Sequence, residues 1–144
     1  MNRQEQIDFL LDHYENPRHK GPLEGDQVVT AEGGNPGCGD VVKIYLKVND
    51  QGQAVVGFEG EGCTISQAAA SYLSEFANGK TLGELDKLDY NDLMDALGRD
   101  IVNQRTRCAT LALDTLRAAI RRREHEQMTA QIAASSQPQD SANG

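Results

Sequence analysis

Hydrophobic and polar positions follow two different periods along this chain, and the first is helical. Four apolar side chains recur at helical spacing within residues 4–15, namely Ile7, Leu10, Leu11 and Tyr14. This spacing predicts an amphipathic helix. We expect it to end at Asn16-Pro17, because the residue before a proline avoids the α region.

Residues 40–48 alternate with the shorter period of a β-strand. One face of this strand would carry Asp40, Val42, Ile44, Leu46 and Val48. The lysines of the other face mark it as solvated. Residues 49–52 predict a hairpin turn, and residues 53–59 a returning strand. With a short strand at residues 28–32, we predict a small three-stranded antiparallel sheet with one buried face, and Asp40 at the end of that face.

Helical spacing resumes after Cys63. We predict a helix that is capped by Thr64 or Ser66 and ends at Asn78-Gly79. Further helices are predicted at residues 82–88, at residues 91–97 and from near Asn103 or Thr106 onward, where the last helix carries Cys108. The expected class is therefore α+β, with helices covering one face of the sheet. Residues 130–144 are polar and predict a flexible tail after a single domain of residues 1–129.

Charge and composition narrow the classes of function. The chain of 144 residues has a formal net charge of −8, which disfavours binding to nucleic acid. No apolar run approaches the roughly 20 residues that cross a bilayer, and no signal-peptide pattern is present. We therefore expect a cytoplasmic protein that binds no membrane. Because the cytosol is reducing, its 3 cysteines are expected to bind metal, to act chemically or to be buried, rather than to form disulfides.

Six arginines gather late in the chain: Arg105, Arg107, Arg117, Arg121, Arg122 and Arg123. Two interpretations are open for this cluster. It forms a solvated helix face, which is the commoner case, or it docks an acidic partner protein.

Each cysteine lies where a reactive sulfur is physically reasonable. Cys38 lies with Asp40 in the glycine-rich loop 33–40, while Cys63 and Cys108 are expected at the beginnings of two helices. The partial positive charge of a helix N-terminus favours thiolate over thiol. Taken singly, a cysteine is more often a small buried hydrophobe. Taken together, three thiols and one carboxylate suit tetrahedral Zn²⁺, and iron is equally natural with thiolates.

The histidines give no comparable signal. None of His13, His19 and His125 is close in sequence to a cysteine. We expect all of them at the surface or at helix caps.

Four segments carry a resemblance to a known family. Their sequences are Leu11-Asp12-His13-Tyr14-Glu15-Asn16-Pro17-Arg18, Asn35-Pro36-Gly37-Cys38-Gly39-Asp40, Gly60-Glu61-Gly62-Cys63-Thr64-Ile65-Ser66 and Arg107-Cys108-Ala109-Thr110-Leu111. From about Ile7 to Arg122 the chain resembles the iron–sulfur cluster assembly scaffolds of the IscU type. It also resembles the N-terminal domain of NifU and, most closely, the SufU-type relatives.

The resemblance implies one site of Cys38, Asp40, Cys63 and Cys108 that binds zinc or iron, or assembles a 2Fe–2S cluster. It implies a cysteine desulfurase of the SufS kind as sulfur donor and downstream scaffold or acceptor proteins as recipients. Cys108 and Cys38 are the candidate sulfur acceptors, with the remaining ligands holding metal. The protein would be at most a zinc-dependent sulfurtransferase, and otherwise a scaffold that builds and transfers the cluster without sulfurtransferase activity.

The chain also departs from the IscU pattern. Arg107 stands where IscU-type proteins have a histidine, and a guanidinium cannot ligate metal because it stays protonated. Residues 100–104 replace the stretch that a specialised chaperone recognises. Both changes favour the SufU type, whereas the interval between Cys63 and Cys108 is of IscU length and lacks the insertion of the best-known SufU proteins. The choice between scaffold and sulfur acceptor therefore stays open.

Overall fold

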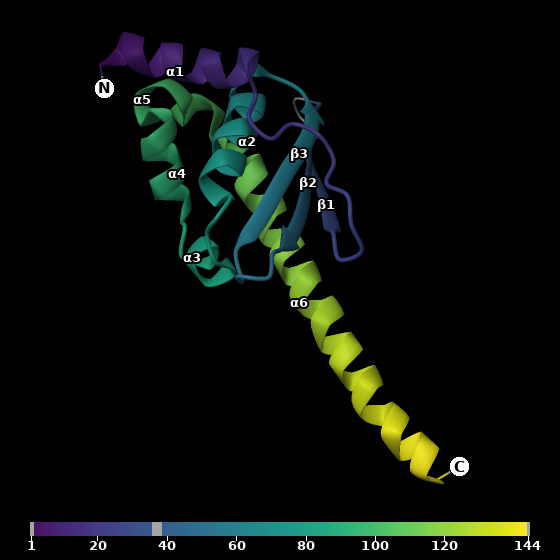
Figure 1. Ribbon diagram of the computed structural model, residues 1–144. Coiled ribbons are helices and arrows are strands. Elements are labelled where there is room, and N and C mark those ends of the chain that lie inside the picture. The colour runs from purple at the N-terminus through teal and green to yellow at the C-terminus, as the bar shows by residue number, and fades with distance from the viewer. Residues whose placement is uncertain (1, 36–38, 144) are drawn as a thin grey trace.

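The computed structural model describes residues 2–35 and 39–143 (Figure 1). The elements are, in order, α1 (Arg3–Glu15), β1 (Val29–Asn35), β2 (Asp40–Val48), β3 (Ala54–Glu61), α2 (Thr64–Ala77), α3 (Leu82–Asp86), α4 (Tyr90–Leu97), α5 (Arg99–Val102), the 3-10 turn η1 (Asn103–Arg105) and α6 (Thr106–Asn143). The predicted helices and strands are all present in these ranges. The sequence pattern did not predict α5 and η1.

The three strands form an antiparallel sheet in the order β1-β2-β3. Ile44 in the central strand lies opposite Ala31 on one side and Phe58 on the other. The side chains of Val42, Ile44 and Leu46 are fully buried. The predicted alternation along residues 40–48 is therefore confirmed for the buried face.

Helices α2 and α6 cover the buried face of the sheet (Figure 1). α6 packs on β1 and β2, while α2 packs on β3 and also contacts α6. Large side chains from both layers fill the space between them, among them Phe58, Leu73, Leu113, Leu116 and Ile120. The predicted α+β class, a three-stranded sheet with helices on one face, is confirmed.

Strand β1 runs further into the glycine-rich segment than the pattern indicated. It was predicted to end at residue 32, but its pairing continues to Asn35, which lies opposite Asp40. Gly33 allows this because it has no Cβ. A Cβ at this position would lie only 2.3 Å from the Thr115 Oγ1 of α6. The close approach of helix and strand keeps the segment in the sheet and brings α6 to the end of the strands.

His13 is buried, with 2% of its surface exposed, so the expectation of a surface histidine was wrong. Its Nδ1 lies 2.8 Å from Ser71 Oγ, and Ser71 Oγ also accepts the backbone N–H of Arg18. The imidazole packs edge-on against Phe9 and Tyr72. Burial first, and then the Arg18 charge, lower the pKa of His13. These contacts fasten α1 to α2.

Helix α6 continues through the domain boundary predicted after residue 129, and its last turns extend away from the sheet (Figure 1). Residues 126–134 are exposed. The flexibility of the segment 130–144 stays a prediction. Within the described part of the chain, no helix combines the length and the apolar composition that a membrane crossing needs.

Candidate metal and thiol site

Asp40 occupies the end of the buried sheet face. It is the first residue of β2, and strand alternation turns its side chain toward the helices, where only 1% of it is exposed. A buried carboxylate needs compensating donors. Two neighbouring segments supply them.

Cys63 lies between β3 and α2, and its backbone N–H donates to Asp40 Oδ1 at 2.7 Å. Its own sulfur caps α2 by accepting the N–H of Ser66 at 3.4 Å. The predicted cap, Thr64 or Ser66, was therefore one to three residues too late. Ser66 contributes in another way, because its hydroxyl donates to the Cys63 carbonyl at 3.0 Å.

Gly62 makes the close approach of Cys63 and Asp40 possible. Its φ of +144° favours glycine, and a Cβ there would lie 2.1 Å from Asp40 Oδ1. The sequence pattern indicated no separate role for this glycine. Its signal was the pair of glycines, Gly60 and Gly62, directly before a cysteine that opens a helix.

Cys108 enters the site from the first turn of α6 and is 2% exposed. Its thiol donates to Asp40 Oδ2 over a Sγ–Oδ2 distance of 3.0 Å, and the Cys63 Sγ lies 3.8 Å from the same oxygen. One ligand atom from each of Asp40, Cys63 and Cys108 lies within 4.8 Å of the other two. Three elements far apart in sequence thus bring two sulfurs and one carboxylate together.

Cys38, the fourth predicted ligand, lies outside the described residues. The structure therefore places three of the four predicted site residues. Within the described part of the chain, this is the one group of three acidic, histidine or cysteine side chains close enough to hold a metal ion. It includes no histidine.

The protonation pattern follows from burial and hydrogen bonding. Burial raises the pKa of Asp40, but hydrogen bonds from the Cys108 thiol, the Cys63 backbone and other nearby donors outweigh it and leave that pKa below its usual value. Burial, followed by the Asp40 carboxylate and Cys63, raises the pKa of Cys108 to about 12. The predicted activation of Cys108 by its helix end is therefore outweighed, and the metal-free site holds Cys108 as a thiol.

The donor set fits a small thiophilic cation. In a tetrahedral zinc site, sulfur and oxygen ligands about 2.3 and 2.0 Å from the metal are roughly 3.5 Å apart. The two sulfur–oxygen distances here, 3.0 Å and 3.8 Å, lie on either side of that spacing. Thiolates also hold iron in clusters. A bound cation would compete with the proton of Cys108, because only a thiolate binds metal.

The chain is similar in sequence to known proteins. The family model described as NifU-like N terminal domain matches residues 5–130. The iron–sulfur cluster assembly scaffold protein IscU 1 of Archaeoglobus fulgidus is 40% identical over 114 residues, covering 78% of this chain and 72% of that protein. The IscU scaffold protein of Azotobacter vinelandii is 35% identical over 122 residues, covering 83% of this chain and 94% of that protein.

Solved structures show the same fold. A putative iron–sulfur cluster assembly scaffold protein for the SUF system, from Fervidobacterium islandicum, superposes with a TM-score of 0.64 at 28% identity, covering 83% of this chain and 99% of that chain. A NifU-like N-terminal protein from Brucella abortus superposes with a TM-score of 0.64 at 24% identity, covering 83% and 98%. The second likeness shows the fold alone.

Proposed function

Since the chain belongs to the NifU-like N-terminal domain family, we propose that it is an iron–sulfur cluster assembly scaffold. The observation that carries this proposal is the convergence of Asp40, Cys63 and Cys108 at one end of the sheet. Cys38 is proposed as the fourth ligand on the resemblance of its loop. The cluster, of the 2Fe–2S kind, is the product that the scaffold passes to acceptor proteins.

The chain's own residues hold the two cysteines of the described site in place. Asp40 fixes both thiols, because it accepts the Cys63 N–H and the Cys108 thiol proton. The site excludes most water, since Asp40 and Cys108 are almost completely buried. Iron or zinc would supply the positive charge that keeps the cysteines in the thiolate form.

We further propose that the site accepts sulfur from a cysteine desulfurase. In this step an acceptor thiolate attacks the outer sulfur of the donor persulfide. The donor S–S bond breaks, the donor leaves as a thiolate, and the acceptor becomes the persulfide. Cys108 and Cys38 are the candidate acceptors, and zinc bound by Cys38, Asp40, Cys63 and Cys108 is the proposed resting state. The absence of a histidine from the described cluster supports this SufU-like reading.

Measurements of desulfurase turnover and of cluster reconstitution distinguish a sulfur acceptor from a scaffold that does not accept sulfur. We expect the wild-type chain to accelerate a SufS-type desulfurase, and Cys→Ser variants at the acceptor to lose that effect while retaining the fold. Full acceleration by both Cys108→Ser and Cys38→Ser would exclude sulfur acceptance at these thiols. A scaffold without this activity would instead form a transferable 2Fe–2S cluster anaerobically and leave the desulfurase rate unchanged. The scaffold names of the IscU relatives favour that second candidate.

Metal analysis of protein purified anaerobically decides between zinc and iron.

The cytoplasmic location, where the thiols would stay reduced, remains a prediction.

A further inference from the structure

Two cysteines of the site lie close together but differ in their access to solvent. The sulfurs of Cys63 and Cys108 lie within 4.8 Å of each other and are not joined by a disulfide. Cys63 is half-buried, whereas Cys108 is 2% exposed. A small reagent from solvent therefore reaches Cys63 before it reaches Cys108.

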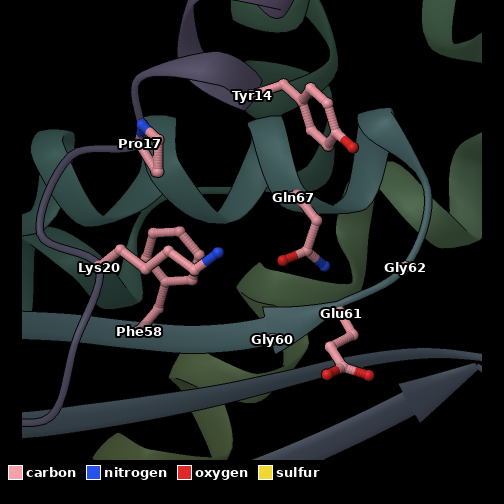
Figure 2. A pocket seen from close by; sticks show the side chains of 8 residues that line it. All are labelled: Tyr14, Pro17, Lys20, Phe58, Gly60, Glu61, Gly62 and Gln67. Carbon is pink, nitrogen blue, oxygen red and sulfur yellow. The ribbon is translucent and has the colours of Figure 1, made fainter.

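The chain that leads into Cys63 borders an open hollow. The hollow has a volume of about 350 Å³, and Gly60, Glu61 and Gly62 line it directly before Cys63 (Figure 2). The side chains of Lys20 and Glu61 add opposite charges to the lining. A hydrophilic hollow of this size admits water and other small polar molecules. This flank of the Cys63 segment is therefore open to a small polar oxidant.

The two sulfurs can meet through side-chain rotation. A disulfide bond is about 2.05 Å long, so the sulfurs need to approach each other by less than about 3 Å. Rotation between two staggered rotamers moves a cysteine sulfur by roughly that distance. Cys63 is the N-cap of α2 and precedes its first helical residue, so its backbone is less constrained than that of Cys108 within α6.

Asp40 places a proton acceptor beside both sulfurs. Its Oδ2 accepts the thiol proton of Cys108 over 3.0 Å and lies 3.8 Å from the Cys63 sulfur. A thiol must lose its proton when its sulfur attacks another sulfur. The carboxylate is placed to take that proton from Cys108.

An accessible cysteine with a second cysteine close behind it is the arrangement of a thiol pair that responds to oxidants. We propose that Cys63 and Cys108 form a reversible disulfide when the metal-free site meets a hydroperoxide. The inference rests on the proposed function, because it describes how the ligand thiols are protected while they hold no metal.

The reaction has two steps. The Cys63 thiolate attacks one peroxide oxygen, so that an S–O bond forms and the O–O bond breaks. The hydroxide that leaves takes up the proton of the original Cys63 thiol and becomes water. The Cys108 sulfur then attacks the sulfenic sulfur of Cys63. Its proton passes through Asp40 to the departing hydroxide, which leaves as a second water. Two thiols are oxidised to one disulfide, and one hydrogen peroxide is reduced to two waters.

The disulfide withdraws two proposed ligands from metal and spares Cys63 the irreversible oxidation to a sulfinic acid. A thiol reductant restores both ligands by exchange. A bound zinc or iron ion would occupy both sulfurs, so a loaded site should resist the oxidant.

The test treats the full-length chain with hydrogen peroxide, either freed of metal by a chelator or loaded with zinc. The remaining thiols are then alkylated and the tryptic peptides are identified by mass spectrometry. Lys43, Lys47 and Arg107 place each cysteine in a different tryptic peptide, so the linked pair can be read directly. We expect a Cys63–Cys108 link in the metal-free chain, its loss on treatment with dithiothreitol, and at least about tenfold slower linkage in the loaded chain.

Two variants separate the roles of the cysteines. In Cys108→Ser, Cys63 should remain a sulfenic acid that dimedone traps, or proceed to the sulfinic acid, because the second thiol is missing. In Cys38→Ser, the link between Cys63 and Cys108 should still form. The peptide map of the wild-type chain decides the matter even where a variant fails to fold.

Any of three results would overturn the inference: a link that involves Cys38 instead, irreversible oxidation of Cys63 without a link, or oxidation of Cys108 in the Cys63→Ser chain as fast as in the wild type. Equal linkage in a chain shown by titration to be zinc-loaded would also overturn it. The zinc titration tests the proposed function separately. A chain that forms the link but binds no metal would keep the thiol pair and lose the proposed scaffold role.

Discussion

The Asp40 carboxylate accepts both the Cys63 N–H and the Cys108 thiol, so it organises the site before any metal arrives. Asp40→Asn keeps an oxygen that can accept the Cys63 N–H but removes the charge. We therefore expect the variant to fold and to bind zinc at least about tenfold more weakly, measured by competition with a chromophoric chelator.

Asp50→Asn is the matched control, because Asp50 lies exposed in the β2–β3 turn. It should leave zinc affinity unchanged. Wild-type affinity in Asp40→Asn would remove Asp40 from the proposed ligand set and leave the thiols as the only ligands supported.

The buried His13 leads us to predict that the stability of the fold depends on pH. Its folded-state pKa lies below the ordinary histidine value of 6.5, because burial and then Arg18 disfavour the charged ring, and Glu75 and Asp12 only partly offset them. As the pH falls through about 6.5, the unfolded chain therefore binds more protons than the folded chain does. The free energy of unfolding decreases as the pH is lowered. Urea unfolding between about pH 5 and pH 7 should show this loss in the wild type and a smaller one in His13→Gln.

The comparison variant for this experiment is His125→Gln, since His125 is exposed on α6. It should retain the wild-type pH dependence. An unchanged slope in His13→Gln would show that other groups cause the acid sensitivity.

Between elements, the junction of β3 and α2 depends on Gly62. Gly62→Ala would combine a positive φ with a Cβ that lies 2.1 Å from Asp40 Oδ1. We expect a loss of about 1–3 kcal/mol in the free energy of unfolding and a weakened metal site, measured by urea unfolding and zinc titration.

Gly52→Ala separates the effect of backbone strain from that of the contact with Asp40. Gly52 also has a positive φ, of +78°, but a Cβ there meets nothing within 4 Å. This control should lose stability through backbone strain alone and keep full zinc affinity. Equal zinc affinity in both variants would contradict the importance of the Gly62–Asp40 contact.

The arginines of the cluster differ in the contacts that they make with other elements. The Arg117 guanidinium donates to the Leu88 carbonyl and lies 4.8 Å from the centre of the Tyr90 ring, so it fastens α6 to the α3–α4 region. The guanidinium of Arg122 faces Glu126 in the same helix at 3.6 Å. These contacts give two members of the cluster structural roles. For the remaining arginines, both interpretations, a solvated helix face and partner docking, stay open.

For the whole molecule, the predicted boundary after residue 129 gives a truncation test. The residues from 126 to 134 are exposed, so this part of α6 adds little to the core. Removing residues 130–144 should change the free energy of unfolding by less than about 0.5 kcal/mol and leave metal binding intact. A larger loss in urea unfolding would mean that the last segment belongs to the folded domain.

The sequence by itself determined most of the elements and which residues are candidates for the site. Alternation along residues 40–48 fixed which face of β2 is buried and turned Asp40 inward, because side chains of a strand alternate strictly between two faces. The helical stripes placed Cys63 and Cys108 at the beginnings of α2 and α6. Local periodicity is sufficient for such features because each depends on residues only a few positions apart.

Only the tertiary structure decided how those parts meet. Ser71 buries His13 from another helix, α6 approaches β1 at Gly33, and burial beside Asp40 raises the pKa of Cys108 to about 12 against the effect of its helix end. Such contacts join residues far apart in the chain, and no local pattern encodes the packing that brings them together.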